Sequence, residues 1–113
     1  MIFTKKKPYT VEEIVGLKEH FEVYIKAVVD IEKQICSAGC DRHFESEKLL
    51  LDQGSKQENL WGGGIDLETK IIDCISFINI RPNQQNTSNE ILDEKTRVKF
   101  TELMEYFFNQ IYG

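Results

Sequence analysis

The sequence predicts an α+β domain of two layers, with a four-stranded, mostly antiparallel sheet and with the N-terminal and C-terminal helices on one face. Apolar residues recur at helical spacing near both ends of the chain and at two-residue spacing in the middle. Turn residues separate the middle segments at hairpin distances. Two one-sided helices must bury their apolar stripes, and packing both on the same face leaves the other face partly polar and open.

Two helices are expected, one near each end. Thr10 and Glu13 match a capping box, in which the threonine hydroxyl accepts from a free main-chain amide and the glutamate bonds back. The apolar stripe that follows predicts a helix over 11–21. Asp93 is expected to cap the final helix, whose apolar positions are Val98, Phe100, Leu103, Met104, Phe107, Phe108 and Ile111.

The first two strands are expected before residue 53. Residues 25–36 alternate between apolar and polar side chains, which is typical of a strand with one buried face. Residues 43–52 lie between two turn signals at hairpin spacing, and we interpret them as a strand. Their leucines, glutamates and lysine also favour a helix, which is the alternative.

Two further strands are expected after the turn at 53–55. One runs through Trp61, and the glycines at 62–64 are expected to end it in a bulge or loop. The other covers 70–81 and is apolar on both faces, which predicts a central strand that Pro82 ends.

Length and charge limit the class of protein. A chain of 113 residues is expected to form one domain over 1–113, with loosely ordered tails at 1–9 and 113. The net charge of -5 argues against nucleic-acid binding, and no apolar run is long enough to suggest a membrane span, so we expect a cytoplasmic location. The spacing of Cys36 and Cys40 differs from that of zinc sites, and neither a metal nor a cofactor is predicted.

Polar side chains on the predicted strands suggest a ligand site. Asp30 and Glu32 share one strand face, and Asn79 and Arg81 share another. The planar guanidinium of Arg81 suits a carboxylate or phosphate, although an ion pair with Asp30 or Glu32 is an equally physical interpretation. The side-chain amides of Gln57 and Asn86 are further candidates, which either bind a polar ligand or satisfy the main chain of loops. The ring of Trp61 is either a platform for a flat ligand or a core residue.

A second constellation suits acid–base chemistry. His43, Glu45 and Glu47 alternate, so on a strand all three would point the same way. A carboxylate that orients an imidazole is suited to proton transfer, and the same trio suits a divalent metal. The spacing also occurs on ordinary solvated strands.

Three blocks of sequence, at 43–55, 57–62 and 78–82, resemble an uncharacterised prokaryotic family, a domain of unknown function. The resemblance covers about residues 10–112 and implies no established activity. Gln85 and Thr87 stand where the family pattern favours glycine and arginine, which changes the shape and charge of that loop. Glu45 stands where aspartate is usual and keeps the acidic character.

Three hypotheses of function follow. The first is a small binding module for a polar or anionic ligand on the open sheet face, held by Arg81, Asn79 and Asn86. The second is a small enzyme in which His43, oriented by Glu45 or Glu47, transfers a proton. The third is a homodimeric interaction protein that closes its open face against a second copy. The residues by themselves specify no reaction or substrate.

Overall fold

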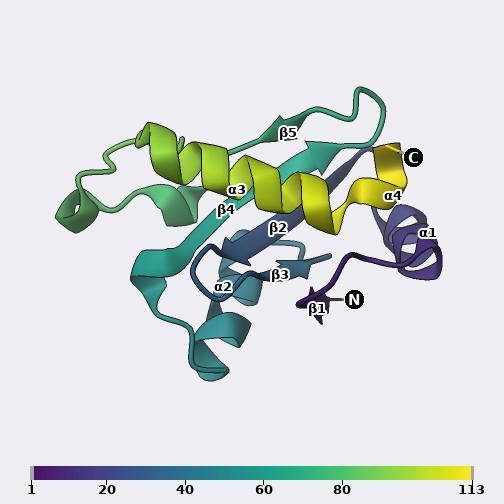
Figure 1. Cartoon of the computed structure of the whole chain (residues 1–113), viewed down its shortest axis with the longest axis horizontal. Coiled ribbons are helices and arrows are strands. Elements are labelled where there is room, and N and C mark those ends of the chain that lie inside the picture. The colour runs from purple at the N-terminus through teal and green to yellow at the C-terminus, as the bar shows by residue number, and fades with distance from the viewer. Residues whose placement is uncertain (1, 113) are drawn as a thin grey trace.

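The computed structural model describes residues 2–112 and confirms the α+β class. Within these residues, five strands form one antiparallel sheet in the order β1-β3-β2-β4-β5, one strand more than predicted (Figure 1). The strands are β1 (Phe3–Lys5), β2 (Tyr24–Asp30), β3 (Ile35–Ala38), β4 (Leu60–Asp66) and β5 (Ile72–Asp73). The helices are α1 (Val11–His20), α2 (His43–Asp52), α3 (Glu94–Phe107) and α4 (Asn109–Tyr112), with short 3-10 turns η1 (Gln57–Asn59), η2 (Phe77–Asn79) and η3 (Pro82–Gln84).

The predicted N-terminal helix is confirmed as α1, the predicted final helix is divided at Phe108 into α3 and α4, and both predicted caps are present. The Thr10 hydroxyl accepts from the Glu13 N–H at 3.2 Å, and the Glu13 carboxylate accepts from the Thr10 N–H at 2.9 Å. At the start of α3, Asp93 accepts from the N–H of Thr96 at 2.9 Å. Helices α1 and α3 contribute to one apolar cluster with the sheet, through Ile14, Leu17, Phe100, Met104 and Phe107.

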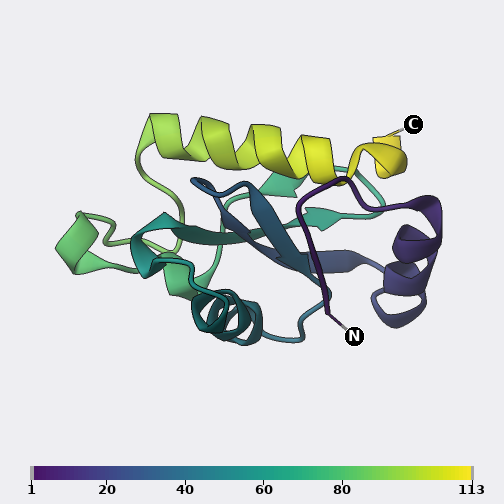
Figure 2. The same ribbon diagram turned by 60° about the horizontal axis from the view of Figure 1, so that its bottom comes forward.

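The second face of the sheet is covered, which corrects the prediction of an open face. Helix α3 lies on one side of the sheet and helix α2 on the other (Figure 2). Leu50 of α2 packs with Val28, Ile35 and Leu60, and the Ser37 hydroxyl donates to that of Ser46 at 2.9 Å. The homodimer was predicted because one face of the sheet was expected to be open. It remains a prediction, but this reason for it no longer applies.

Residues 43–52 form helix α2, so the predicted strand is wrong. The two buried residues of α2, Ser46 and Leu50, are four positions apart, as on one side of a helix. At the start of the helix the Glu45 carboxylate accepts from the N–H of Arg42 at 2.8 Å. The intrinsic helix preference of the leucines, glutamates and lysine therefore outweighs the hairpin-like spacing.

The single strand predicted over 25–36 is a hairpin of β2 and β3. Asp30 ends β2, and its carboxylate accepts from the N–H groups of Glu32 at 3.0 Å and Lys33 at 2.8 Å. Gln34 completes the turn with a φ of 57°, in the left-handed region. Three consecutive polar residues, Glu32, Lys33 and Gln34, interrupt the alternation at this turn, and the prediction of one continuous strand passed over that signal.

The three central glycines lie inside strand β4, where a break is predicted. A Cβ at Gly62 would lie 2.7 Å from the Cβ of Ser76, and one at Gly63 would lie 2.7 Å from the ring of Phe100. A Cβ at Gly64 would collide with the ring of Tyr24. Glycine is therefore required here for close packing on both sides of β4 rather than for a bend.

Only a short part of the predicted central strand over 70–81 joins the sheet. Ile72–Asp73 form β5 at the sheet edge, and the chain then folds into η2 and η3. The side chain of Phe77 is 84% exposed, and Ile80 is also exposed. Apolar residues on both faces indicated a buried strand, yet several of them face solvent.

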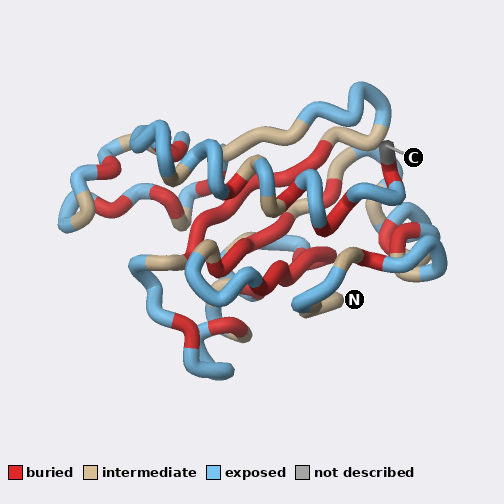
Figure 3. Tube along the Cα trace, viewed as in Figure 1, coloured by how far each residue is buried: buried red, intermediate tan, exposed pale blue. Residues whose placement is uncertain are grey.

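Burial is concentrated in β2, β3 and β4, which appear as red segments through the middle of Figure 3. Within the range predicted as a loose tail, β1 pairs with β3, and the hydroxyl of buried Tyr9 donates to the main-chain oxygen of Phe3 at 2.7 Å. Residue 113 lies outside the described residues. None of the helices in residues 2–112 is long and apolar enough to cross a membrane.

Candidate functional site

Two adjoining hollows lie between the start of α2, the end of β2 nearest Tyr24, and the segment that leads into η2. Their volumes are about 600 Å³ and 310 Å³, and both are lined by Lys26, His43, Ser76 and Phe77. We call the two together the His43 cleft. The first hollow is completed by Asp41, Arg42, Phe44 and Ile78, and the second by Tyr24, Asp73, Ile75 and Asn89.

His43 is held in one orientation by strand β4. Its Nε2 lies 2.7 Å from the main-chain oxygen of Gly63. A carbonyl oxygen only accepts hydrogen bonds, so Nε2 carries the proton and Nδ1 keeps a lone pair. Burial lowers the pKa of His43; the bond to Gly63 opposes that shift, and the charge of Lys26 adds to it. The side chain is therefore a neutral imidazole at neutral pH, and its Nδ1 makes no hydrogen bond within residues 2–112.

Tyr24 and Asp73 form the far wall of the cleft. The Tyr24 hydroxyl donates to Oδ2 of Asp73 at 2.7 Å, which joins strand β2 to strand β5 across β4. Burial and this carboxylate raise the pKa of Tyr24, so the phenol stays protonated. The ring lies over Gly64, where any side chain would collide with it. The glycine in β4 thus makes room for a wall of the cleft.

The rim combines cations with exposed aromatic rings. The Lys26 ammonium donates to the main-chain oxygen of Asp41 at 3.0 Å, which fixes its charge beside the opening. Arg42 forms no ion pair within the described chain. Phe77 is 84% exposed and Phe44 is 54% exposed, and both line the same hollow. The rim therefore offers positive charge and apolar surface side by side.

The predicted trio of His43, Glu45 and Glu47 does not converge. On a helix, side chains two positions apart point in nearly opposite directions. His43 faces the cleft, Glu45 accepts from the N–H of Arg42, and Oε2 of Glu47 lies 3.8 Å from Nη2 of Arg81. Neither carboxylate orients the imidazole. Within residues 2–112, no group of three or more His, Cys, Asp or Glu side chains is placed to hold a metal ion.

Arg81 is buried and its guanidinium is occupied by the protein. It donates to the main-chain oxygens of Ile78 at 2.9 Å and Gln57 at 2.6 Å, and to that of Leu60. Its Cζ lies 4.6 Å from the centre of the Trp61 ring, and that ring is itself buried. These contacts tie η1, β4 and η2 together. The ion pair that the sequence offered as an alternative forms with Glu47 rather than with Asp30 or Glu32.

The remaining predicted ligand residues are also separated from the cleft. The buried amide of Asn86 donates to the main-chain oxygens of Asn79 at 2.7 Å and Glu90 at 2.8 Å, which closes the loop after η3. Asp30 is fully buried and accepts from the Ser55 hydroxyl at 2.6 Å. Glu32 and Gln57 are exposed, in the β2–β3 turn and in η1. The predicted ligand residues thus do not form one patch.

Sequence reasoning missed Tyr24, Lys26, Asp73, Ser76 and Phe77. Tyr24 and Lys26 occupy the same strand face as Asp30, so the alternation in β2 was a usable signal for them. Asp73 and Ser76 lie in a stretch that resembled a buried strand. Only their approach to α2 reveals them as parts of a cleft.

Fold and cleft together define a small α+β domain whose antiparallel sheet lies between helices and carries ligand-sized hollows. The sequence matches the profile of a family described as "Protein of unknown function (DUF5674)" over residues 3–107. The chain belongs to this family, and the resemblance to a domain of unknown function is confirmed. No curated protein and no solved structure matches the chain.

Proposed function

We propose that this protein is a binding module for a small ligand that carries one anionic group beside a flat or apolar body, and that the ligand occupies the His43 cleft. The observation that carries the proposal is the convergence of Lys26, Arg42 and His43 with two exposed phenylalanine rings around one hollow of about 600 Å³. Hollows of several hundred Å³ with a few polar groups are typical of small-molecule sites.

The charges of the larger hollow favour a monoanion, whereas the second carboxylate of the cleft, that of Asp73, lines the smaller hollow and accepts from Tyr24. The whole chain has a net charge of -5, yet Lys26 and Arg42 line this hollow against a single carboxylate, that of Asp41. Arg42 has no ion pair in the described chain and is free to meet a carboxylate or phosphate. The neutral Nδ1 of His43 accepts a hydrogen bond, so it selects a ligand that also carries a hydroxyl or amide donor.

The apolar part of the ligand is suggested by the rim. Exposed large apolar side chains scattered singly need no explanation, but two phenylalanines on one opening form an apolar surface. Flat rings stack on such side chains and bury area at low entropic cost. An aromatic or branched organic acid combines both requirements.

Thermal-shift measurements over a panel of aromatic and aliphatic carboxylates and nucleotides test the proposal. A ligand at ~100 times its dissociation constant stabilises the fold by about 2.7 kcal/mol. We expect Arg42→Gln to reduce the shift strongly and Lys48→Gln, at an exposed position of α2, to leave it unchanged. A panel without any hit, or an equal shift in both variants, contradicts the proposal.

A second candidate is a small acid–base enzyme, favoured by the free lone pair on Nδ1 of His43. An imidazole with a lowered pKa is neutral at physiological pH and serves as a general base. The variant His43→Gln retains an amide donor for the oxygen of Gly63 and lacks the basic nitrogen. If the protein converts a bound ligand, NMR of the mixture should show product with the native chain and no product with the His43→Gln variant. The variant should still bind the ligand.

A further inference from the structure

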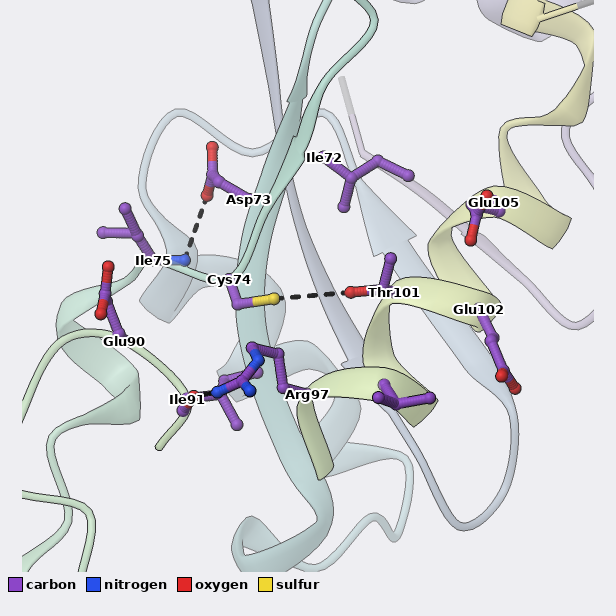
Figure 4. Close-up of a pocket in the computed structure, with 11 residues that line it drawn as sticks. Ile72, Asp73, Cys74, Ile75, Glu90, Ile91, Arg97, Thr101, Glu102 and Glu105 are labelled. Carbon is purple, nitrogen blue, oxygen red and sulfur yellow. Dashed lines mark hydrogen bonds between the residues drawn. The ribbon is translucent and has the colours of Figure 1, made fainter. Parts of the chain in front are cut away.

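A groove separate from the main body of the His43 cleft runs between helix α3 and the edge of the sheet. Its volume is about 670 Å³. Figure 4 shows Cys74 and Thr101 facing each other across its middle, with the Cys74 thiol 3.7 Å from the Thr101 hydroxyl. Ile72, Ile75, Ile91 and Val98 supply further apolar lining. Only Asp73 and Ile75 also line the cleft.

The charges around this groove are opposite to those at the rim of the cleft. Four carboxylates line it, those of Asp73, Glu90, Glu102 and Glu105, against the single guanidinium of Arg97. Figure 4 shows Asp73 and Glu90 on the sheet side and Glu102 and Glu105 on α3. Arg97 donates to the main-chain oxygen of Ile91 at 3.2 Å, and none of the glutamates has an ion-pair partner within residues 2–112.

The adjoining main chain suits an extended occupant. Strand β5 ends the strand order, so one side of Ile72–Asp73 has no neighbouring strand, whereas the chain that follows is bridged at Ile75 to Glu90. An edge strand presents main-chain N–H and C=O groups that an added segment can pair with. Its length of two residues, Ile72–Asp73, means that side-chain contacts must supply most of the affinity.

We propose that the groove binds an extended peptide segment of a partner protein in which lysine or arginine residues alternate with apolar ones. Apolar side chains of the segment pack onto the floor of the groove, which the contact between Cys74 and Thr101 closes, and its cations meet the carboxylates on the two walls. Side chains of a strand alternate between its two faces, so alternation places apolar groups inward and leaves the flexible basic side chains to reach the rim. This proposal is independent of the ligand proposed for the His43 cleft.

The test uses fluorescence anisotropy with a short labelled peptide in which lysines alternate with valines and leucines, at physiological ionic strength. One reference peptide has the same composition but carries its lysines grouped at one end. A second reference peptide has glutamates in place of the lysines. We expect the alternating peptide to bind most tightly. Tighter binding of the grouped peptide overturns the proposal, because it indicates general attraction between a basic peptide and an acidic protein.

Matched charge variants locate the binding. The double substitution Glu102→Gln with Glu105→Gln removes two carboxylates from the groove, and Glu12→Gln with Glu19→Gln removes two exposed ones from α1. We expect about tenfold weaker binding from the first pair, equivalent to ~1.4 kcal/mol, and less than about twofold from the second. Equal weakening by both pairs overturns the proposal.

A steric variant provides a second measurement at constant charge. Thr101→Met places a larger apolar side chain in the middle of the groove, where the Thr101 hydroxyl meets Cys74. We expect this substitution to weaken the binding of the peptide. The binding of spermidine, a linear cation without a side chain to bury, should be unaffected. Peptide binding that is unchanged by Thr101→Met, or spermidine binding as tight as that of the peptide, overturns the proposed peptide segment.

Discussion

The side-chain amide of Asn79 forms the same pair of hydrogen bonds with Gly62 that a neighbouring strand would form. Oδ1 of Asn79 accepts from the Gly62 N–H at 2.8 Å, and Nδ2 donates to the Gly62 main-chain oxygen at 2.9 Å. Nδ2 also donates to the main-chain oxygens of Cys74 and Asn89, both at 3.1 Å. One fully buried side chain thus replaces strand pairing where the 70–81 segment leaves the sheet.

Removal of the Asn79 amide should destabilise the fold. Asn79→Ala leaves the buried N–H and C=O of Gly62 without partners, and each unsatisfied group costs ~1–3 kcal/mol. We expect a loss of about 3 kcal/mol or more in urea unfolding, and a similar loss for Asn79→Asp, which keeps the acceptor and loses the donor. The exposed Asn83→Ala should change stability by less than ~0.5 kcal/mol. Loss of ligand binding without loss of stability would instead favour the ligand role for Asn79.

The glycines of β4 should not tolerate even a methyl group. In Gly63→Ala the Cβ would collide with the main-chain oxygen of Asp73, and in Gly64→Ala it would collide with the Tyr24 ring. A Cβ at Gly64 would also lie 2.6 Å from the main-chain oxygen of Ile25, so main chain limits the space at both positions. Overpacking of this kind costs ~1–3 kcal/mol. We therefore expect both variants to unfold at a lower temperature than the native chain, and no loss in either variant contradicts the packing described for β4.

A substitution by lysine distinguishes the hydrogen bonds of the Arg81 guanidinium from the effect of its positive charge. Lysine keeps the charge and lacks the planar fork that reaches the main-chain oxygens of Ile78, Gln57 and Leu60. Arg81→Lys should lower the free energy of unfolding by about 2–4 kcal/mol and shift the fluorescence of Trp61, the only tryptophan. Arg42→Lys, at the exposed rim, should alter neither. Full stability in Arg81→Lys would show that charge alone suffices.

The protonation of His43 predicts a pH dependence with a definite sign. Burial holds the folded pKa of His43 below its ordinary value of 6.5. As the pH falls below about 6.5, the unfolded chain takes up this proton before the folded chain does, so the stabilising contribution is lost with falling pH. NMR titration should give a pKa below 6.5, and the loss of stability between pH 6.5 and this lower value should be smaller in His43→Gln. A pKa above 6.5 would contradict the buried, neutral imidazole.

The sequence predicted the elements whose signals are local. The Thr10 capping box and the Asp93 cap lie within one helical turn of the amides that they satisfy, so both terminal helices were readable. His43 was identified as a candidate because it alternates with Glu45 and Glu47, although the strand on which that argument depended is helix α2. Its partner, the main-chain oxygen of Gly63, is 20 residues away and has no sequence signal.

Strands and polar roles were less readable, because they depend on distant partners. Arg81 and Asn79 are polar residues in apolar surroundings, a pattern that a ligand site and a buried structural network share. The partners of Asn79 include the main chain of Gly62, 17 residues away, and main-chain atoms look the same in every sequence. The predicted strand over 43–52 is wrong for a different reason: two turn signals outweighed a helix preference that was present in the residues themselves.

By itself, the sequence determined the two terminal helices, the α+β class, the acidic net charge and the resemblance to a family. Tertiary structure decided that both faces of the sheet are covered, that Gly62, Gly63 and Gly64 continue strand β4, and that Lys26 and His43 rather than Arg81 line a cleft. The physical reason is the separation along the chain of the groups that interact. Caps and amphipathic stripes act within one or two turns of chain, whereas sheet pairing and the burial of a charge are settled by atoms that only the folded chain brings together.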